Sequence, residues 1–326
     1  MGYIEDRKRE LEKYLPPLTR KPDFDLFWEQ SLEESRRLPL GLEVKRLEDY
    51  PAEKVHVYDI SYQGMENTRI HGWYLAPRTA GGGRFPCVIQ YHGFSGSRGM
   101  PSDHLFWTAL GMAVLAVDCR GQGGITADHA CYQEAYFDGP ACRGILDPHE
   151  YYYRHVYLDS VRAVDAACAM EETDRDRIVL HGISQGGALV MAAAALDSRP
   201  AAALADVPGN SDLAVRVEGE YGSFGAAAAY LRRFPKHTDT AFGTLSYFDT
   251  MNLASRITCP VLCSVSLKDK TCPAECFFAT YNRIESDKQI EIYPFCGHEN
   301  AYSIQMEKKL VFLRHCNIIG LSLIHI

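Results

Sequence analysis

The stretch IVLHGISQGGALVMAAAAL, residues 178–196, decides which fold we expect for this chain. A short apolar run leads into the corner Gly182-Ile183-Ser184-Gln185-Gly186, and a helix-forming run rich in alanine follows. A G-x-S-x-G corner between a strand and a helix is a strained turn that lifts the serine hydroxyl clear of the sheet. Gly182 and Gly186 let the strand and the helix pack closely there. The pattern alone is weak, but this context predicts that Ser184 is a nucleophile rather than a buried turn residue.

Further apolar runs of strand length lie on both sides of this corner, and each ends at Gly, Asp or Pro. The runs cover residues 86–93, 112–121, 178–182, 201–209, 260–269 and 289–295. Helix-like stretches such as 157–170 lie between several of them. Continuous apolar strands that alternate with helices indicate an α/β fold with a mostly parallel central sheet and helices on both faces. In such sheets functional side chains gather at the carboxyl ends of the strands.

The N-terminal part has a different pattern. Segment 23–38 predicts a helix, with Phe24, Phe27, Trp28, Ser31 and Leu32 on one face. KVHVYDISY and RIHGWYLAP then alternate apolar and polar residues around QGMENT, which predicts an antiparallel hairpin. No repeat or long linker interrupts the chain, so we expect a single domain over residues 1–317 with an N-terminal helix and hairpin extension. The apolar tail 318–326 is left out of this assignment.

A serine nucleophile needs a base, and the base needs an acid that orients it. In sheets of this kind the three residues follow the chain in the order Ser, acid, His. After Ser184, the run 260–269 ends at Asp269, and the run 289–295 is followed by His298. The interval between Asp269 and His298 has room for one helix and one strand. The sequence therefore predicts a catalytic triad of Ser184, Asp269 and His298.

Several other residues compete for these roles. Asp206 also ends a strand-like run, but Val-Pro follows it at once. Asp118 precedes the serine in the chain, so a structural or hydrogen-bonding role suits it better. The competing histidines are His92, His181, His237 and His325. The first two lie within or beside strands and are expected to be structural, whereas the last two have no strand end near them.

Acyl transfer also requires backbone N–H groups that stabilise the charge developing on the carbonyl oxygen. The N–H of Gln185, directly after the nucleophile at the helix start, is one candidate. The second donor is expected from the loop after an early strand, YHGFSGSRG at 91–99. Phe94 follows His92-Gly93 in that loop and is our choice, although an ordinary apolar loop residue is the alternative. We therefore expect an oxyanion hole formed by Gln185 and Phe94.

Composition limits the remaining possibilities. The chain has 326 residues, a net charge of −8 and eleven cysteines. The acidic balance argues against nucleic acid or an anionic membrane as partner, and no apolar run is long enough to span a bilayer. Without a secretory signal the cysteines are expected as reduced thiols in a cytoplasmic protein. The pairs Cys259/Cys263 and Cys272/Cys276 have x3 spacing, but Cys263 lies in an apolar, strand-like run and no His-x3-5-His pattern accompanies the pairs, so no metal is expected.

The motifs resemble carbohydrate esterase family 7, the acetyl xylan esterases and cephalosporin-C deacetylases of the α/β-hydrolase superfamily. The resemblance covers almost the whole chain, including PCVIQYHGFSGSRG, DCRGQGG, GISQGG, DVPGNSD, TLSYFDTMNLA, KDKTCPA and GHEN. Its most specific part combines Arg120-Gly121-Gln122 with the serine corner and with His298-Glu299. The resemblance implies that Arg120 and Gln122 brace the loops around the site and that Glu299 fixes the histidine loop.

The resemblance further implies a serine esterase that removes acetyl groups from short acetylated xylo-oligosaccharides and from cephalosporin C, without cofactor or metal. Members of the family are typically intracellular hexamers. Their insertion, expected here at about 124–153, forms the subunit interface and narrows the entrance to the site. The tyrosine-rich EYYYRHVY is expected on that surface. Two rival functions remain open: a serine peptidase of the same fold, and a non-catalytic hydrolase-like binding protein.

Two departures from the family pattern concern the pocket. The family usually has tyrosine where this chain has Phe94, so the backbone N–H is kept but a ring hydroxyl is lost. The loop after Asp206, PGNSDL, is more polar and richer in glycine than a pocket wall of this kind would be. Both departures leave the preferred ester open.

Overall fold

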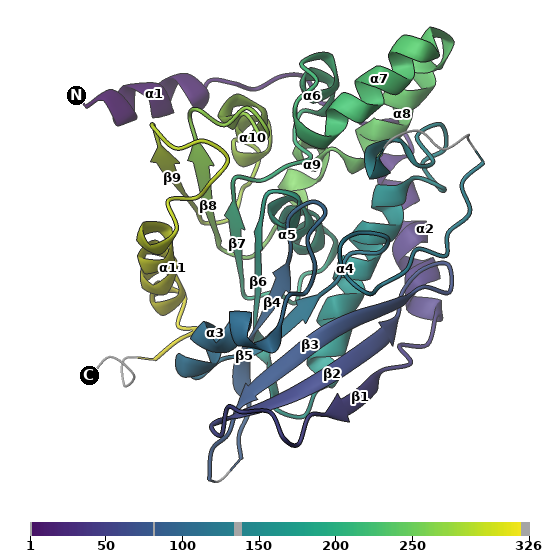
Figure 1. Ribbon diagram of the computed structural model, residues 1–326. Helices are drawn as coiled ribbons and strands as arrows, with labels where there is room; N and C mark the ends of the chain where they lie inside the picture. The colour runs from purple at the N-terminus through teal and green to yellow at the C-terminus, as the bar shows by residue number, and fades with distance from the viewer. Residues whose placement is uncertain (1, 81, 134–138, 321–326) are drawn as a thin grey trace.

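The computed structural model describes residues 2–80, 82–133 and 139–320. In this part of the chain the strands form one sheet in the order β1-β2-β3-β5-β4-β6-β7-β8-β9 (Figure 1). The strands are β1 Glu43–Arg46, β2 Val55–Gln63, β3 Arg69–Pro77, β4 Phe85–Tyr91, β5 Ala113–Val117, β6 Thr173–Ile183, β7 Ala202–Asp206, β8 Val261–Ser266 and β9 Lys288–Tyr293. From β5 to β9 all neighbours are parallel, whereas β1, β2, β3 and β5 pair antiparallel. The expected mostly parallel sheet and N-terminal hairpin are confirmed.

Helices cover both faces of this sheet (Figure 1). They are α1 Tyr3–Leu11, α2 Phe24–Arg37, α3 Leu105–Ala109, α4 Tyr152–Ala169, α5 Gln185–Leu196, α6 Leu213–Glu218, α7 Gly225–Arg233, α8 Thr238–Phe248, α9 Thr250–Leu253, α10 Ala274–Tyr281 and α11 Ser303–His315. None of the helices in the described residues is both long and apolar enough to cross a bilayer.

The central strands are largely apolar because both of their faces are buried. Every residue of β5, β7 and β8 is buried. Successive side chains of a strand point to opposite faces, so neighbours such as Val88 and Ile89 belong to two different core clusters. The smaller cluster packs the sheet against α3 and α11 through Trp107 and Phe312. The larger cluster lies under α2, α4 and α5.

The predicted N-terminal helix is confirmed as α2. Its apolar face is buried at Phe24, Phe27, Trp28 and Ser31, and Leu32 is partly buried against the larger core cluster. The Trp28 indole N–H donates to the carbonyl of Tyr247 at 3.1 Å, so the ring can be buried without losing a hydrogen bond.

The tyrosine-rich segment is buried, so the expectation of a surface was wrong there. Tyr151, Tyr152, Tyr153 and Tyr157 are at most 1% exposed, at the start of α4. Each of these rings has a polar partner inside the protein: the Tyr157 hydroxyl, for example, donates to the carbonyl of Phe248 at 2.8 Å. A tyrosine whose hydroxyl has a hydrogen-bond partner can bury its ring in the core. The sequence alone does not show whether such a partner is present. Of the expected insertion at 124–153, residues 134–138 lie outside the described residues.

A helical segment between β7 and β8, which was not expected as an insertion, lies over the carboxyl ends of the central strands (Figure 1). It comprises α6, α7, α8 and α9, and its alanine-rich residues 225–229 are the first turns of α7. Because this edge of the sheet carries Ser184, the segment is placed to form a wall of the site.

The C-terminal tail is not wholly separate from the fold. Ile318 is 2% exposed and packs in the smaller core cluster with Phe312 and Leu313. Leaving residue 318 out of the fold was therefore wrong, because an apolar side chain after a helix can still return to the core. Residues 321–326, and with them His325, lie outside the described residues.

Candidate active site

Ser184 occupies the corner between β6 and α5 in a strained conformation. Its φ of 60° and ψ of −120° lie outside the regions that L-residues ordinarily adopt. The Ser184 N–H donates to the carbonyl of Asp206 at 2.9 Å, which ties the corner to the end of β7. Strain of this kind persists only where the surrounding structure enforces it.

The two glycines of the corner permit this close packing. A Cβ on Gly182 would lie 2.4 Å from the carbonyl of Gly186, and a Cβ on Gly186 would lie 2.0 Å from the carbonyl oxygen of Tyr91. Real Cβ atoms do not approach other atoms so closely, so any other residue would push α5 away from β4 or β6. Both glycines are therefore required by the backbone itself.

The structure brings the predicted Ser184, His298 and Asp269 into one hydrogen-bonded chain. His298 Nε2 lies 2.8 Å from Ser184 Oγ, and His298 Nδ1 lies 2.7 Å from Asp269 Oδ2. The other Asp269 oxygen accepts from the N–H groups of Thr271 and Cys272 at 2.7 and 2.8 Å. The Asp269 carboxylate is fully buried, whereas the His298 ring is 31% exposed. This arrangement can carry a proton from the serine to the imidazole while the carboxylate holds the ring in place.

Asp206, the competing candidate for the acid, bonds to groups other than His298. Its carboxylate pairs with the buried Lys309 and accepts from Asn300 Nδ2 at 2.7 Å and Gln305 Nε2 at 2.9 Å. Burial opposes ionisation of Asp206, but Lys309 and these donors hold the pKa of the carboxyl below its ordinary value. His181 Nε2 lies 2.8 Å from Lys309 Nζ, so this histidine belongs to the same structural network.

The remaining competitors are also structural. The Asp118 carboxylate accepts from the N–H groups of Arg98 and Ile125 at 2.6 and 3.0 Å. His92 Nε2 accepts from the N–H of Cys119 at 2.8 Å, and burial lowers the pKa of this imidazole. His237 bonds the Tyr230 hydroxyl through Nδ1 at 2.8 Å. None of these groups contacts Ser184 in the described part of the chain.

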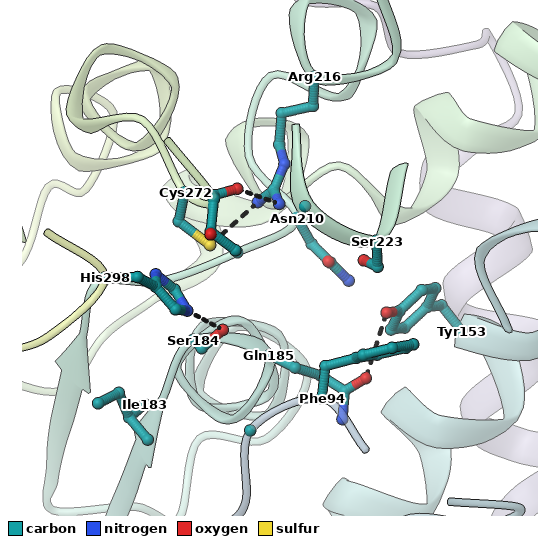
Figure 2. A pocket seen from close by; sticks show the side chains of 14 residues that line it. Phe94, Tyr153, Ile183, Ser184, Gln185, Asn210, Arg216, Ser223, Cys272 and His298 are labelled. Carbon is teal, nitrogen blue, oxygen red and sulfur yellow. Dashed lines mark hydrogen bonds between the residues drawn. The ribbon is translucent and has the colours of Figure 1, made fainter. Parts of the chain in front are cut away.

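The two expected oxyanion donors flank the serine. The Gln185 N–H is at the first position of α5, where helix geometry leaves it without an intrahelical acceptor. The loop that carries Phe94 passes directly beside Ser184, since a Cβ on Gly93 would lie 3.8 Å from the Ser184 Cβ. Both residues line the same cavity as Ser184 (Figure 2).

Gln122 connects these two elements. Its amide forms a reciprocal pair with that of Gln185, with Nε2–Oε1 distances of 3.0 and 3.2 Å. Its oxygen also accepts from the N–H of Ser95 at 2.8 Å, one residue after Phe94. Gln122 thus contacts both the corner at Ser184 and the loop that carries Phe94, the kind of bracing that the family resemblance implied.

Arg120 and Glu299 support the neighbouring loops. Arg120 is completely buried and donates to both oxygens of Asp159, from Nε at 2.7 Å and from Nη2 at 2.9 Å. At Gly121, which follows it, φ is +61° and a Cβ would lie 2.9 Å from that of Asp128. Glu299 Oε1 accepts from the N–H of Gly297 at 3.1 Å, across His298. These contacts fit the predicted bracing roles.

The comparisons agree with this geometry. The sequence profile of the family Acetyl xylan esterase (AXE1) matches residues 1–316. The chain belongs to this family. An acetyl xylan esterase from Paenibacillus sp. R4 is 40% identical, with a TM-score of 0.90 over 98% of this chain and 100% of that one. Acetyl Xylan Esterase 1 from Thermoanaerobacterium sp. is 32% identical, with a TM-score of 0.88 over 98% and 99% of the two chains.

A curated relative, the acetyl esterase Axe7A of Xylanibacter ruminicola, is 29% identical over 87% of this chain. The chain spans 65% of the length of that relative. An α/β-hydrolase from Penicillium sp., 19% identical over 80% of this chain and 96% of that one with a TM-score of 0.55, shares the fold alone. Together these matches confirm the family resemblance and the α/β-hydrolase fold.

In this acetyl xylan esterase family member, a cavity of about 550 Å³ opens in front of Ser184 (Figure 2). The volume is in the range of small-molecule sites. Five of the side chains that line it were not predicted from the sequence as pocket residues: Tyr153, Asn210, Arg216, Ser223 and Cys272. The polar loop PGNSDL was the available signal for Asn210, whereas the helical segment that places Arg216 and Ser223 left no recognisable pattern.

Phe94 lacks the ring hydroxyl of the usual tyrosine, but another tyrosine, Tyr153, lines the same cavity (Figure 2). The Tyr153 hydroxyl, on α4, donates to Gln185 Oε1 at 3.2 Å. The Cys272 thiol interacts with both Ser184 and Arg216, and burial raises its pKa, so it is present as the neutral thiol. In the described part of the chain no disulfide joins any of the cysteines.

Proposed function

We propose that the protein is a serine esterase that removes acetyl groups from small acetylated carbohydrates. The observation that carries this proposal is the hydrogen-bonded chain from Ser184 Oγ through His298 to Asp269, at 2.8 and 2.7 Å, beside two N–H groups in a cavity. Membership of the acetyl xylan esterase family supports the acetyl group as the acyl part.

The first step forms an acetyl-enzyme. Ser184 Oγ attacks the acetyl carbonyl while His298 Nε2 takes the hydroxyl proton, and the N–H groups of Gln185 and Phe94 stabilise the oxyanion. As the tetrahedral intermediate collapses, the ester bond breaks and the imidazolium gives its proton to the leaving sugar hydroxyl. Asp269 stabilises the imidazolium and orients its ring throughout.

The second step hydrolyses this intermediate. A water molecule attacks the acetyl carbonyl while His298 takes one of its protons, and the bond to Ser184 Oγ then breaks. His298 returns the proton to the serine, so acetate leaves and the free enzyme is restored. In the net reaction one acetyl ester and one water molecule are consumed, and one alcohol and one acetic acid are formed. No other reagent is required.

Three finer points of the proposal rest on the family resemblance. They are a preference for xylo-oligosaccharide acetates, activity on the acetyl ester of cephalosporin C, and a cytoplasmic hexamer. Size-exclusion chromatography with light scattering tests the hexamer. A panel of acetylated xylo-oligosaccharides, polymeric xylan and cephalosporin C tests the substrates, and a preference for polymer over oligosaccharide would contradict the proposed substrate size.

The decisive experiment compares Ser184→Ala with the exposed control Ser198→Ala. We expect Ser184→Ala to abolish hydrolysis of p-nitrophenyl acetate and Ser198→Ala to leave it at the wild-type rate. Mass spectrometry of quenched wild-type reactions should show the acetyl group on the peptide that contains Ser184. Substantial turnover by purified Ser184→Ala, or a preference for acyl chains beyond about four carbons, would contradict the proposal. An inactive wild type would favour a binding protein, and cleavage of peptides would favour a peptidase.

A further inference from the structure

The cavity in front of Ser184 contains a buried positive charge without a counter-ion. Arg216, on α6, lines this cavity and is 3% exposed. No carboxylate of the described residues lies within ion-pair distance of its guanidinium. A guanidinium group carries a positive charge, and a buried charge that is not paired is costly. The structure therefore maintains a cation at this position for which the described residues supply no anion.

The Arg216 guanidinium uses only some of its N–H donors in hydrogen bonds within the protein. Nη2 donates to the carbonyl of Thr271 at 2.9 Å and to that of Tyr221 at 3.5 Å, and Nη1 contacts the Cys272 sulfur at 3.5 Å. In the described part of the chain the Nε atom has no acceptor at all. A guanidinium has five N–H donors, and it forms its best bonds in pairs with a carboxylate.

The acidic groups around Arg216 already have other partners. Asp269 holds His298 and two backbone N–H groups. Asp212 accepts from the Tyr14 hydroxyl at 2.6 Å. Asp249 caps α9 and accepts from the N–H groups of Leu213 and Met251 at 2.7 and 3.0 Å. None of these carboxylates is therefore available to neutralise the guanidinium.

Two glycines make room for the guanidinium inside the wall of the cavity. A Cβ on Gly209 would lie 3.2 Å from Arg216 Nη1, and a Cβ on Gly222 would lie 3.0 Å from Nη2. The Phe224 ring covers the other side, with its centre 5.1 Å from the guanidinium carbon. The position is thus built around this side chain rather than reached by a mobile surface arginine.

One side chain, that of Cys272, lies between the Arg216 guanidinium and the proposed nucleophile Ser184. The Cys272 thiol contacts Arg216 and also interacts with Ser184, so it separates the cation from the reacting serine. Figure 2 shows the guanidinium on the side of the cavity opposite Phe94, whose N–H is assigned to the acetyl oxygen. A substrate whose acetyl carbonyl lies in the oxyanion hole would therefore direct its alcohol part toward the wall that carries Arg216.

We propose that Arg216 binds a carboxylate on the alcohol part of the ester, so that the preferred substrates are acetylated uronic acids or oligosaccharides that contain them. This inference rests on the proposed esterase function and deepens it. Asn210, which lines the same cavity, offers its amide to the neighbouring hydroxyl groups. The carboxylate would neutralise the buried cation, which a neutral xylose unit cannot do.

The test uses two substrates that differ only in charge: a mono-acetylated methyl glucuronoside and the matching glucuronamide. We expect the wild-type kcat/KM to favour the acid by about 10- to 100-fold, the range for hydrogen bonds to charged groups. Arg216→Gln should reduce this ratio to about one, and Arg216→Lys should retain part of it. The control Arg175→Gln removes an exposed guanidinium near the start of β6, far along the strand from Ser184, and should leave the ratio unchanged.

Equal wild-type rates on the two substrates, or an equal loss on both in Arg216→Gln, would overturn the inference in favour of a purely structural arginine. The proposed esterase function is judged separately by hydrolysis of p-nitrophenyl acetate. If the Arg216 variants do not fold, inhibition of the wild type decides the question. Glucuronate should then inhibit competitively at concentrations at least about tenfold below glucuronamide, more weakly as salt is added, and equal inhibition by both would again overturn the inference.

Discussion

The side-chain amides of Gln122 and Gln185 face each other in a reciprocal hydrogen-bonded pair, with distances of 3.0 and 3.2 Å. Through this pair, the loop after β5 holds the residue that follows the nucleophile. The same Gln122 oxygen accepts from the N–H of Ser95, so one side chain sets the spacing between both proposed oxyanion donors. A part of the proposed catalytic geometry is therefore controlled by a residue that does not touch the reacting atoms.

Replacing Gln122 by Ala should lower kcat/KM for p-nitrophenyl acetate by about 10- to 100-fold, because displacing oxyanion donors by a fraction of an ångström weakens transition-state binding. The fall should appear mainly in kcat rather than in KM. Gln289→Ala removes an exposed amide on β9 and is the control expected to show the wild-type rate. A Gln122→Ala enzyme with unchanged kcat would show that the oxyanion loop holds its position unaided.

Asp269 and Asp206 both follow strands, but their substitutions should have different effects. Asp269→Asn should lower kcat by about 10⁴-fold with little loss of folded protein, because His298 loses its orienting carboxylate. Asp206→Asn should chiefly lower the free energy of unfolding, because Lys309 would keep a buried charge without its counter-ion. Steady-state kinetics and urea unfolding of both variants separate the two roles. A larger fall in kcat for Asp206→Asn than for Asp269→Asn would reverse our assignment of the acid.

Gly186 should not tolerate even the smallest side chain. Gly186→Ala places a Cβ 2.0 Å from the Tyr91 carbonyl oxygen, so we expect little soluble protein or a loss of at least about 3 kcal/mol in the free energy of unfolding. Gly243→Ala is the matched control within α8, where the nearest atom, on Lys21, is 3.5 Å from the new Cβ. That change should stabilise the protein by about 0.5–1 kcal/mol. Equal unfolding midpoints for the two variants would contradict the packing described at the nucleophile corner.

Stability should fall as the pH drops below about 6.5. Burial lowers the pKa of His155 and of His181 to about 3, so the native state keeps both neutral where the unfolded chain takes up a proton at each. The unfolded state then binds more protons, and each histidine reduces the free energy of unfolding by up to about 1.4 kcal/mol per pH unit between pH 6.5 and 3. His155→Phe should make this dependence shallower, whereas the exposed control His315→Phe should not. Urea unfolding at pH 8, 6 and 5 measures the slopes, and an unchanged slope in His155→Phe would refute the prediction.

Much of the site could be predicted because the residues that form it follow strand ends in a fixed order. Ser184, Asp269 and His298 come after three strands of one parallel sheet, and such strands end at the same edge. The pocket wall could not be found in this way. Arg216 and Ser223 are in a helical segment inserted between β7 and β8, where the composition of a helix says nothing about which side chain faces the cavity.

The sequence by itself determined the parallel sheet, the nucleophile corner and the order of the proposed triad, because these depend on local patterns: apolar strands, glycines that permit a strained turn, and polar residues at strand ends. Only the tertiary structure decided that Tyr151, Tyr152 and Tyr153 are core residues, and that Arg216 is enclosed in the cavity with no carboxylate partner among the residues that the structure describes. Burial of a phenol or a guanidinium depends on partners far away in the chain, such as Arg120 for the hydroxyl of Tyr152. No local pattern encodes such partners, because they are brought together only when the whole chain has folded.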